Sequence, residues 1–368
     1  MTYRRAVIPA LAGSLLMTLL LWWAGASAQA LQLRGSTSVF DVESASELRR
    51  WLAPWSYDAG PAGGDAALTG GTRYSDLYGT AMQIRFVAVF AFFLAGALLL
   101  IRRIPPTRGR TPPTLLALWA WGPVAGTLAV TVSAPWLIAA GGHGSYRFLP
   151  RLAGLIASSG PVMVATALLT ALLTVLVARV TAEGADPVPL RGVPPRAARL
   201  AASAGTAVIA VSLVILSYTS VAAWIQTSFT GAGLLSEPGD LLREWLLLGS
   251  WTGPASAPLG DWLLYRAADV LMLAVVWWAL RLLPGLLTRT TVPAMAVGAV
   301  CATVLGLLAS QVLHMAVDDT VTVWGPVHLF SKLGDHVPAA LTFGLVAGLV
   351  SLAALRLAGG RDTVDSSR

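Results

Sequence analysis

Eight long apolar segments constrain this chain of 368 residues more than any other feature. A helix needs about 20 mostly apolar residues to cross the roughly 30 Å hydrocarbon core of a bilayer. Hydrophobic residues make up 56% of the chain and charged residues 12%, which is about half the charged share of a soluble domain. The sequence therefore predicts an all-α polytopic membrane protein with spans near 6–28, 84–101, 114–140, 152–178, 200–225, 262–283, 291–317 and 337–355.

The first apolar run ends in LLLWWAGASAQALQL (19–33), whose Ala-Ser-Ala and Ala-Gln-Ala patterns resemble a secretory cleavage site. The run from 6 to 26 is, however, longer than the about 7 to 15 residues of a signal-peptide core. The fifth run ends in a similar small and aromatic stretch, SYTSVAAWIQTS (217–228), at an internal position. We therefore expect the first run to be retained as a membrane span.

Charged residues divide unevenly between the two sides of the expected bundle. If the loops alternate and the N-terminus lies inside, the inner segments hold 15 arginines and 4 acidic residues, and the outer segments hold 10 basic and 14 acidic residues. Basic residues favour the cytoplasmic side of a membrane. The preference for arginine over lysine indicates a GC-rich genome. We expect a bacterial cytoplasmic membrane protein with both termini in the cytoplasm.

Two polar segments of the outer loops are similar to each other. ESASELRRWL (43–52) and EPGDLLREWL (237–246) are identical at five of ten positions without a gap. A shorter match relates RFLPRL (147–152), between the third and fourth runs, to HLFSKL (328–333), between the seventh and eighth. Because these matches lie in polar loops, the general likeness of apolar runs does not explain them. We expect a duplicated four-span unit.

Each expected unit has an even number of spans, so the two copies are parallel and related by an axis along the membrane normal. The fold prediction is thus eight transmembrane helices arranged as a tandem parallel duplication of a four-helix unit. The first unit is residues 1–190 with a long outer loop at 29–83, and the second is residues 191–368 with an outer loop at 226–261.

The matched outer segments carry apolar residues at helical spacing between charged ones, which is the pattern of a short amphipathic helix. We expect one such interfacial helix in each unit, with its tryptophans facing lipid or the spans. A packed lid is the simpler interpretation, and a gate over a path between the spans is the alternative. The residues that define these helices are Arg49, Trp51, Trp55, Arg243 and Trp245.

All four histidines fall on the expected outer side, and those of the second half accompany carboxylates. Imidazoles near carboxylates suit a divalent metal or a pH-sensitive contact. No HExxH or other tight histidine spacing fixes a metal geometry, so we predict no catalytic residue, cofactor site or metal site. The candidate that remains is an outer-face polar cluster of His314, Asp318, His328, Asp335 and His336.

Few ionisable residues lie inside the apolar runs. Arg85 and the pair Arg266 and Asp269 lie near the outer boundary, and we expect the pair to anchor the sixth run. Serine and threonine residues of the fourth and fifth runs indicate close helix packing or a hydroxyl-lined path. Cys301 is the single cysteine, so no disulfide forms within the chain, and we expect it to be a packing residue.

Three functions fit this architecture. The first is transport, as a permease-type subunit or a carrier of neutral or lipid-like cargo, because few titratable groups lie deep enough to couple protons or sodium. The second is a non-catalytic accessory or scaffolding protein of the cell envelope. The third, an enzyme acting on lipid-linked substrate at the outer face, is least favoured because no hydrolase, ATPase or dinucleotide-binding motif is present.

The expected partners follow from the same features. The apolar runs require the lipid bilayer, and a permease-type subunit requires a membrane or ATPase partner protein. No nucleic acid is expected, because the arginines do not gather into a patch of groove size.

Overall fold

A computed structural model describes residues 3–30, 71–106, 110–140, 148–157, 159–182, 193–229, 231, 237–253, 259–317 and 333–365. Within these residues the chain forms eleven α-helices and one π-helical segment. Tyr218 and Trp251 form an isolated parallel bridge. Eight helical segments are long and apolar enough to cross a membrane, in agreement with the predicted all-α multi-pass membrane protein.

The first helix group consists of α1 (Tyr3–Ala30), α3 (Gly71–Arg103), α4 (Thr111–Ala140) and α6 (Gly160–Ala182). These four helices contact one another in a closed order, α1 with α3, α3 with α4, α4 with α6 and α6 with α1. The side chains of Met17 and Leu21 are fully buried. The first apolar run is therefore an integral part of the core of this group.

The second helix group consists of α7 (Pro195–Ala210), α10 (Leu259–Leu286), α11 (Val292–Val317) and α13 (Val337–Asp365). Here α7 contacts α10, α10 contacts α11, α11 contacts α13 and α13 returns to α7. The order of contacts along the chain is the same as in the first group.

Several expected spans have different ends in the structure. The span expected near 84–101 belongs to α3, which begins at Gly71, so residues 71–83 are helical and not part of the expected outer loop. The last helix, α13, continues past residue 355 to Asp365. The run near 152–178 begins in a separate short helix, α5 (Phe148–Ala157), and the spanning helix α6 begins only at Gly160. Ser159 donates its hydroxyl to the Ile156 carbonyl (2.8 Å) at the end of α5. Pro161 then suits the first turn of α6, where a backbone N–H is not needed.

The run near 200–225 is interrupted. After α7 the chain forms the π-helical segment η4 (Val211–Leu216), and it resumes an α-helix only at α8 (Thr219–Ser228). The expected fifth span therefore comprises α7 and η4, which the length and hydropathy of residues 195–216 make a candidate span of their own.

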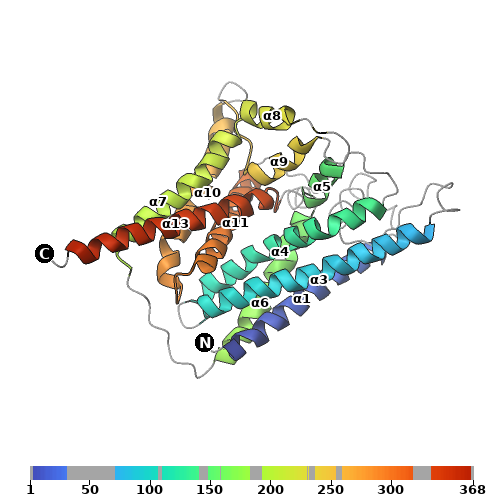
Figure 1. The fold of residues 1–368 in the computed structure, drawn as a ribbon, viewed down its shortest axis with the longest axis horizontal. Coiled ribbons are helices and arrows are strands. Elements are labelled where there is room, and N and C mark those ends of the chain that lie inside the picture. The colour runs from blue at the N-terminus through green and yellow to red at the C-terminus, as the bar shows by residue number, and fades with distance from the viewer. Residues whose placement is uncertain are drawn as a thin grey trace.

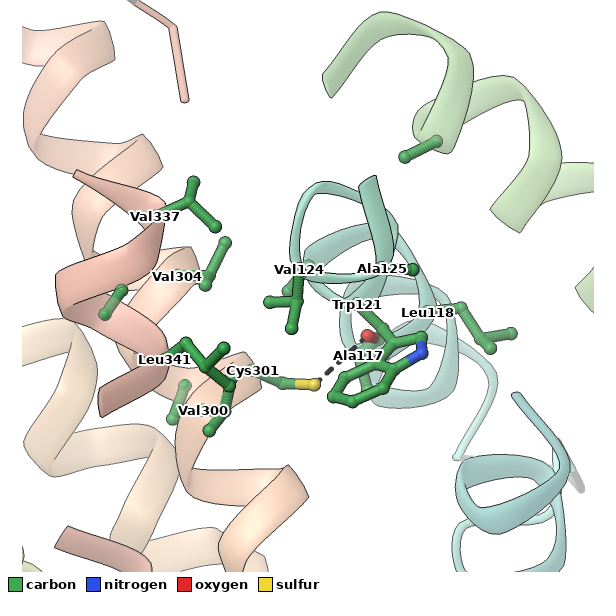
Figure 2. Close-up of a cluster of buried hydrophobic side chains, with 14 of the residues drawn as sticks. Ala117, Leu118, Trp121, Val124, Ala125, Val300, Cys301, Val304, Val337 and Leu341 are labelled. Carbon is green, nitrogen blue, oxygen red and sulfur yellow. Dashed lines mark hydrogen bonds between the residues drawn. The ribbon is translucent and has the colours of Figure 1, made fainter. Parts of the chain in front are cut away.

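The two helix groups meet along α4 and α11, with α13 also touching α4 and α11 touching α3. We call this contact the seam. Figure 2 shows Ala117 and Val124 of α4 facing Val300 and Cys301 of α11 and Leu341 of α13, and all five side chains are buried. The Cys301 thiol donates to the Ala117 carbonyl oxygen at 3.3 Å. The described part of the seam is thus a dry, closely packed contact.

Both ends of the chain lie at one end of the bundle, and α5, α8 and α9 (Pro238–Leu246) gather at the other (Figure 1). We call these the terminal end and the capped end. Among the described side chains, the terminal end carries nine arginines and no carboxylate. The capped end carries four arginines and all six described carboxylates, which are Asp76, Glu237, Asp240, Glu244, Asp269 and Asp335.

Candidate functional site

The short helix α9 closes the capped end of the second group. It contacts α5, α8 and α13, and Leu241 and Trp245 pack against the buried core. On its other side Arg243 donates to the side-chain oxygen of Gln226 (3.3 Å), and Gln226 donates to Asp240 (2.8 Å). The apolar face of the predicted amphipathic helix at 237–246 therefore faces the helix bundle, and Trp245 is a packing residue.

We call residues 211–218 the interrupted segment. It lies next to the last residue of α9. The Ser217 amide donates to the Ser212 carbonyl (3.0 Å), which is the five-residue spacing of a π-helix, and the Ser217 hydroxyl donates to the same carbonyl (2.8 Å). Tyr218 is extended, so α8 leaves in a new direction. Serine and threonine compete for backbone groups in this way and disfavour a helix interior.

The interrupted segment is hydrogen-bonded to the last residue of α9 and to the chain that follows that helix. The Ser212 hydroxyl donates to the Leu246 carbonyl (2.5 Å), and the Trp251 amide donates to the Ser217 carbonyl (2.8 Å). The Thr219 amide donates in turn to the Trp251 carbonyl (3.0 Å). Irregular backbone at membrane depth is tolerated only where protein or a water-filled cavity satisfies it, and here residues 246–251 do so.

Arg266 of α10 holds residues 250–251 from the other side. Its guanidinium lies 3.8 Å from the centroid of the Trp251 ring, within range of a cation–π contact. It forms the expected ion pair with Asp269 (2.8 Å) and donates to the Ser250 carbonyl (3.3 Å). The pair thus anchors α10 and also attaches that helix to the interrupted segment.

Three residues of the outer-face polar cluster, His314, Asp335 and His336, lie among the described residues. His314 of α11 packs on the Tyr265 ring of α10, with 5.2 Å between the ring centroids. One turn earlier, Gln311 accepts from the Gly334 amide (3.0 Å) and donates to the Asp335 carbonyl (3.2 Å). Gln311, which the cluster omits, therefore fixes the turn that leads into α13, and His314 faces a different helix.

His336 begins α13 and faces α9. Its imidazole is hydrogen-bonded to the backbone of Leu247, and Arg243 lies within electrostatic range. Burial lowers the pKa of His336, Arg243 lowers it further, and the hydrogen bond to Leu247 opposes both. Burial also raises the pKa of Glu244, against the effect of Arg243. The contact between α9 and α13 therefore contains two titratable groups that burial holds toward their neutral forms.

Several predicted residues lie outside the described part of the chain. These are Asp318 and His328 of the polar cluster and the whole first interfacial helix with Arg49, Trp51 and Trp55. No group of three or more histidine, cysteine or acidic side chains suited to a metal ion occurs among the described residues.

The sequence does not predict the interruption, because its serines indicate either close packing or a hydroxyl-lined path. The signal was Ser-Tyr-Thr-Ser at 217–220, four residues that favour caps or strands over a helix interior. The described geometry offers hydroxyl groups, aromatic faces and an unwound backbone at the capped end of the second group. In comparisons with protein-family models, curated proteins and solved structures, no match to this chain was found.

Proposed function

We propose that this integral membrane protein serves transport, as a carrier or permease-type subunit for neutral or lipid-like cargo. The observation that carries the proposal is the interruption of the fifth span at residues 211–218, with its backbone bonded to residues 246–251. Discontinuous helices are a common construction of transporter sites, and π-helical turns occur frequently at functional sites.

The charge distribution favours uncharged cargo. Arg85, which is buried within α3, donates to the Ser133 hydroxyl (2.9 Å), and Arg266 is paired with Asp269. Both features belong to the half of the bundle near the capped end. Proton- and sodium-driven transporters use titratable groups near the bilayer midplane, and the described spans offer none there. A separate ATPase partner or a downhill gradient is the energy source that fits.

We place the path in the second helix group, beside α7, and not along the seam between the groups. The seam is filled by buried apolar side chains over its described length (Figure 2). The interrupted segment, by contrast, is a contact of hydroxyls with an unwound backbone, which offers polar groups beside α7. The last residue of α9 contacts it, since the Ser212 hydroxyl donates to the Leu246 carbonyl.

Fluorescent phospholipid translocation in proteoliposomes tests this proposal. Vesicles carrying protein should bring more acyl-labelled phosphatidylglycerol within reach of an external quencher than vesicles without protein. Ser217→Ala should change that rate, and Thr227→Ala, on the exposed face of α8, should not. Equal quenching with folded protein and without it would contradict lipid transport.

Thiol labelling of the single cysteine can locate the transport path. Cys301 lies buried in the seam, so thiol labelling that remained slow during transport would support a path beside α7. Labelling that accelerates with transport would move the path to the seam.

An accessory role in the cell envelope is the second candidate, because α8 presents exposed aromatic side chains. Trp224 is 62% exposed and Phe229 is 45% exposed, and the two rings meet edge to face. Such a pair suits either the bilayer interface or a partner protein. Loss of a specific complex on Trp224→Ala, with translocation unchanged, would favour this role.

We further propose that the chain is a tandem duplication, with units at 1–190 and 191–368. The same closed order of helix contacts in both helix groups supports it. The meeting of α4 with α11, the third spans of their units, supports it as well, because a twofold axis places equivalent elements beside each other.

A further inference from the structure

The two inner connections of the helix groups are joined at the terminal end. The Thr288 amide, after α10, donates to the carbonyl of Arg103 at the end of α3 (3.0 Å). The Thr114 hydroxyl of α4 donates to the next carbonyl, that of Ile104 (2.8 Å). Residues 103–104 are thus held between the first turn of α4 and the turn before α11. We call residues 102–104, 110–114 and 288–291 the arginine junction.

Several buried donors at the arginine junction have no acceptor among the described residues. Arg110 is 4% exposed, and neither of its terminal nitrogens has a hydrogen-bond partner. The Nε of Arg103 and the Thr291 hydroxyl are also buried without a hydrogen-bond partner among the described residues. An unsatisfied buried donor of this kind destabilises the folded protein, and more so when it is charged. Guanidinium nitrogens can only donate, so the missing partner is an acceptor.

The positive charge of the arginine junction indicates that the acceptor is an anion. Arg102 and Arg289 lie close enough to Arg103 to repel its charge. No described side chain at the terminal end is a carboxylate that would offset the repulsion between Arg103 and Arg289. An anion with several oxygens, such as a phosphodiester, supplies acceptors for the buried donors of Arg110 and Arg103, and arginine matches such oxygens in geometry.

We propose that the arginine junction binds the phosphodiester group of an anionic phospholipid. The candidate spans that meet here end at Arg103 and Leu286 and begin again at Thr111 and Val292, so the junction lies at headgroup depth. On α10, Leu282 is 40% exposed one turn deeper than the span end at Leu286 and Trp278 is 60% exposed two turns deeper, where both can contact acyl chains. The lipid joins the two helix groups by contacting residues of both.

Lipid binding to the delipidated full-length protein tests the proposal. Native mass spectrometry and the thermal midpoint in a nonionic detergent are measured with added phosphatidylglycerol, phosphatidylcholine or inorganic phosphate. We expect phosphatidylglycerol alone to bind at stoichiometric level and to raise the midpoint. Each arginine removed should weaken binding about fivefold.

Arg289→Gln is the principal variant, because that side chain is exposed and its loss does not perturb the core. Arg110→Gln is the second variant and removes the buried donors. Arg179→Gln and Arg196→Gln are matched controls, since both arginines are exposed at the same end on other helices. Equal binding of the two phospholipids, or equal loss in the control variants, overturns the proposal. If inorganic phosphate raised the thermal midpoint as much as phosphatidylglycerol does, the bound anion would not be a lipid, and the proposal would be wrong.

Discussion

Gly13 of α1 lies so close to Thr174 of α6 that a Cβ added to the glycine would overlap the threonine hydroxyl. Gly205 of α7 has the same relation to the Ser351 hydroxyl of α13. Each pair joins the first and last spans of one helix group and closes its order of contacts. Small residues opposite hydroxyl residues allow such close helix approach in membranes.

Replacing either glycine by alanine should therefore destabilise its helix group. In Gly205→Ala the new methyl displaces Ser351, whose hydroxyl donates to the Ala201 carbonyl (3.0 Å). Overpacking of this kind costs about 1–3 kcal/mol, and the thermal midpoint in detergent should fall. Gly79→Ala is the control, because no heavy atom lies within 4 Å of a Cβ there and alanine favours a helix. Equal midpoints for the two variants would contradict the close approach.

The interrupted segment should depend on its two serine hydroxyls. Ser217→Ala removes a donor to the Ser212 carbonyl and an acceptor for the Gly249 amide, and Ser212→Ala removes the donor to Leu246. Ser217→Ala thus takes the partner of the partly buried Gly249 amide, and Ser212→Ala that of the partly buried Leu246 carbonyl, each at about 1 kcal/mol. Hydrogen exchange should rise selectively at residues 246–251. If hydrogen exchange at residues 246–251 did not differ between either variant and the unmodified protein, the serines would not stabilise this segment.

Hydropathy and charge predicted the eight spans and the multi-pass class, because those follow from transfer free energies that each segment carries by itself. The interruption at 211–218 was missed, because the run stays apolar on both sides and the unwound backbone is stable only with residues 246–251 bonded to it. Hydropathy alone cannot predict a hydrogen-bonding partner that lies about 30 residues further along the chain.

The polar cluster shows the same limit in another form. Sequence neighbourhood and helical spacing group His314 with Asp335 and His336, and they do not predict that His314 contacts Tyr265 of α10 or that His336 is hydrogen-bonded to Leu247. Which neighbour each imidazole meets depends on how α9 and α10 pack around α11 and α13. On α11, Gln311 fixes the turn that leads into α13. No sequence motif marks a glutamine in that role.

Arg266 and Asp269 should be coupled energetically. The ion pair is 2.8 Å long, and its side chains are only 12% and 15% exposed. A double-mutant cycle with Arg266→Gln and Asp269→Asn should give a coupling free energy of about 0.5–3 kcal/mol. Arg266→Gln alone should be the more damaging variant, because it also loses the Trp251 and Ser250 contacts. A coupling of zero would mean that the two charges are independent.

Cys301 should resist modification in the folded protein. Its side chain is 2% exposed, and the thiol is bonded to Ala117 across the seam. A maleimide reagent should label the detergent-solubilised protein only slowly, and rapidly once the protein is denatured. Since the chain contains one cysteine, intact mass gives the labelled fraction directly. Rapid labelling of the folded protein would show that the seam opens or that the two helix groups separate.

The contact between α9 and α13 should weaken in acid because of His336. Burial lowers its pKa below the ordinary value of 6.5, so the unfolded chain takes up a proton at a higher pH than the folded protein does. Stability from the neutral imidazole is then complete above about pH 6.5 and declines as the pH falls below it. Glu244, whose pKa burial raises, acts with the opposite sign, so the comparison is made between the unmodified protein and His336→Asn. Asparagine tolerates the left-handed backbone of this position (φ 64°). The thermal midpoint of the unmodified protein should fall more steeply between pH 7 and pH 5 than that of the variant, and parallel profiles would exclude His336 as the group responsible.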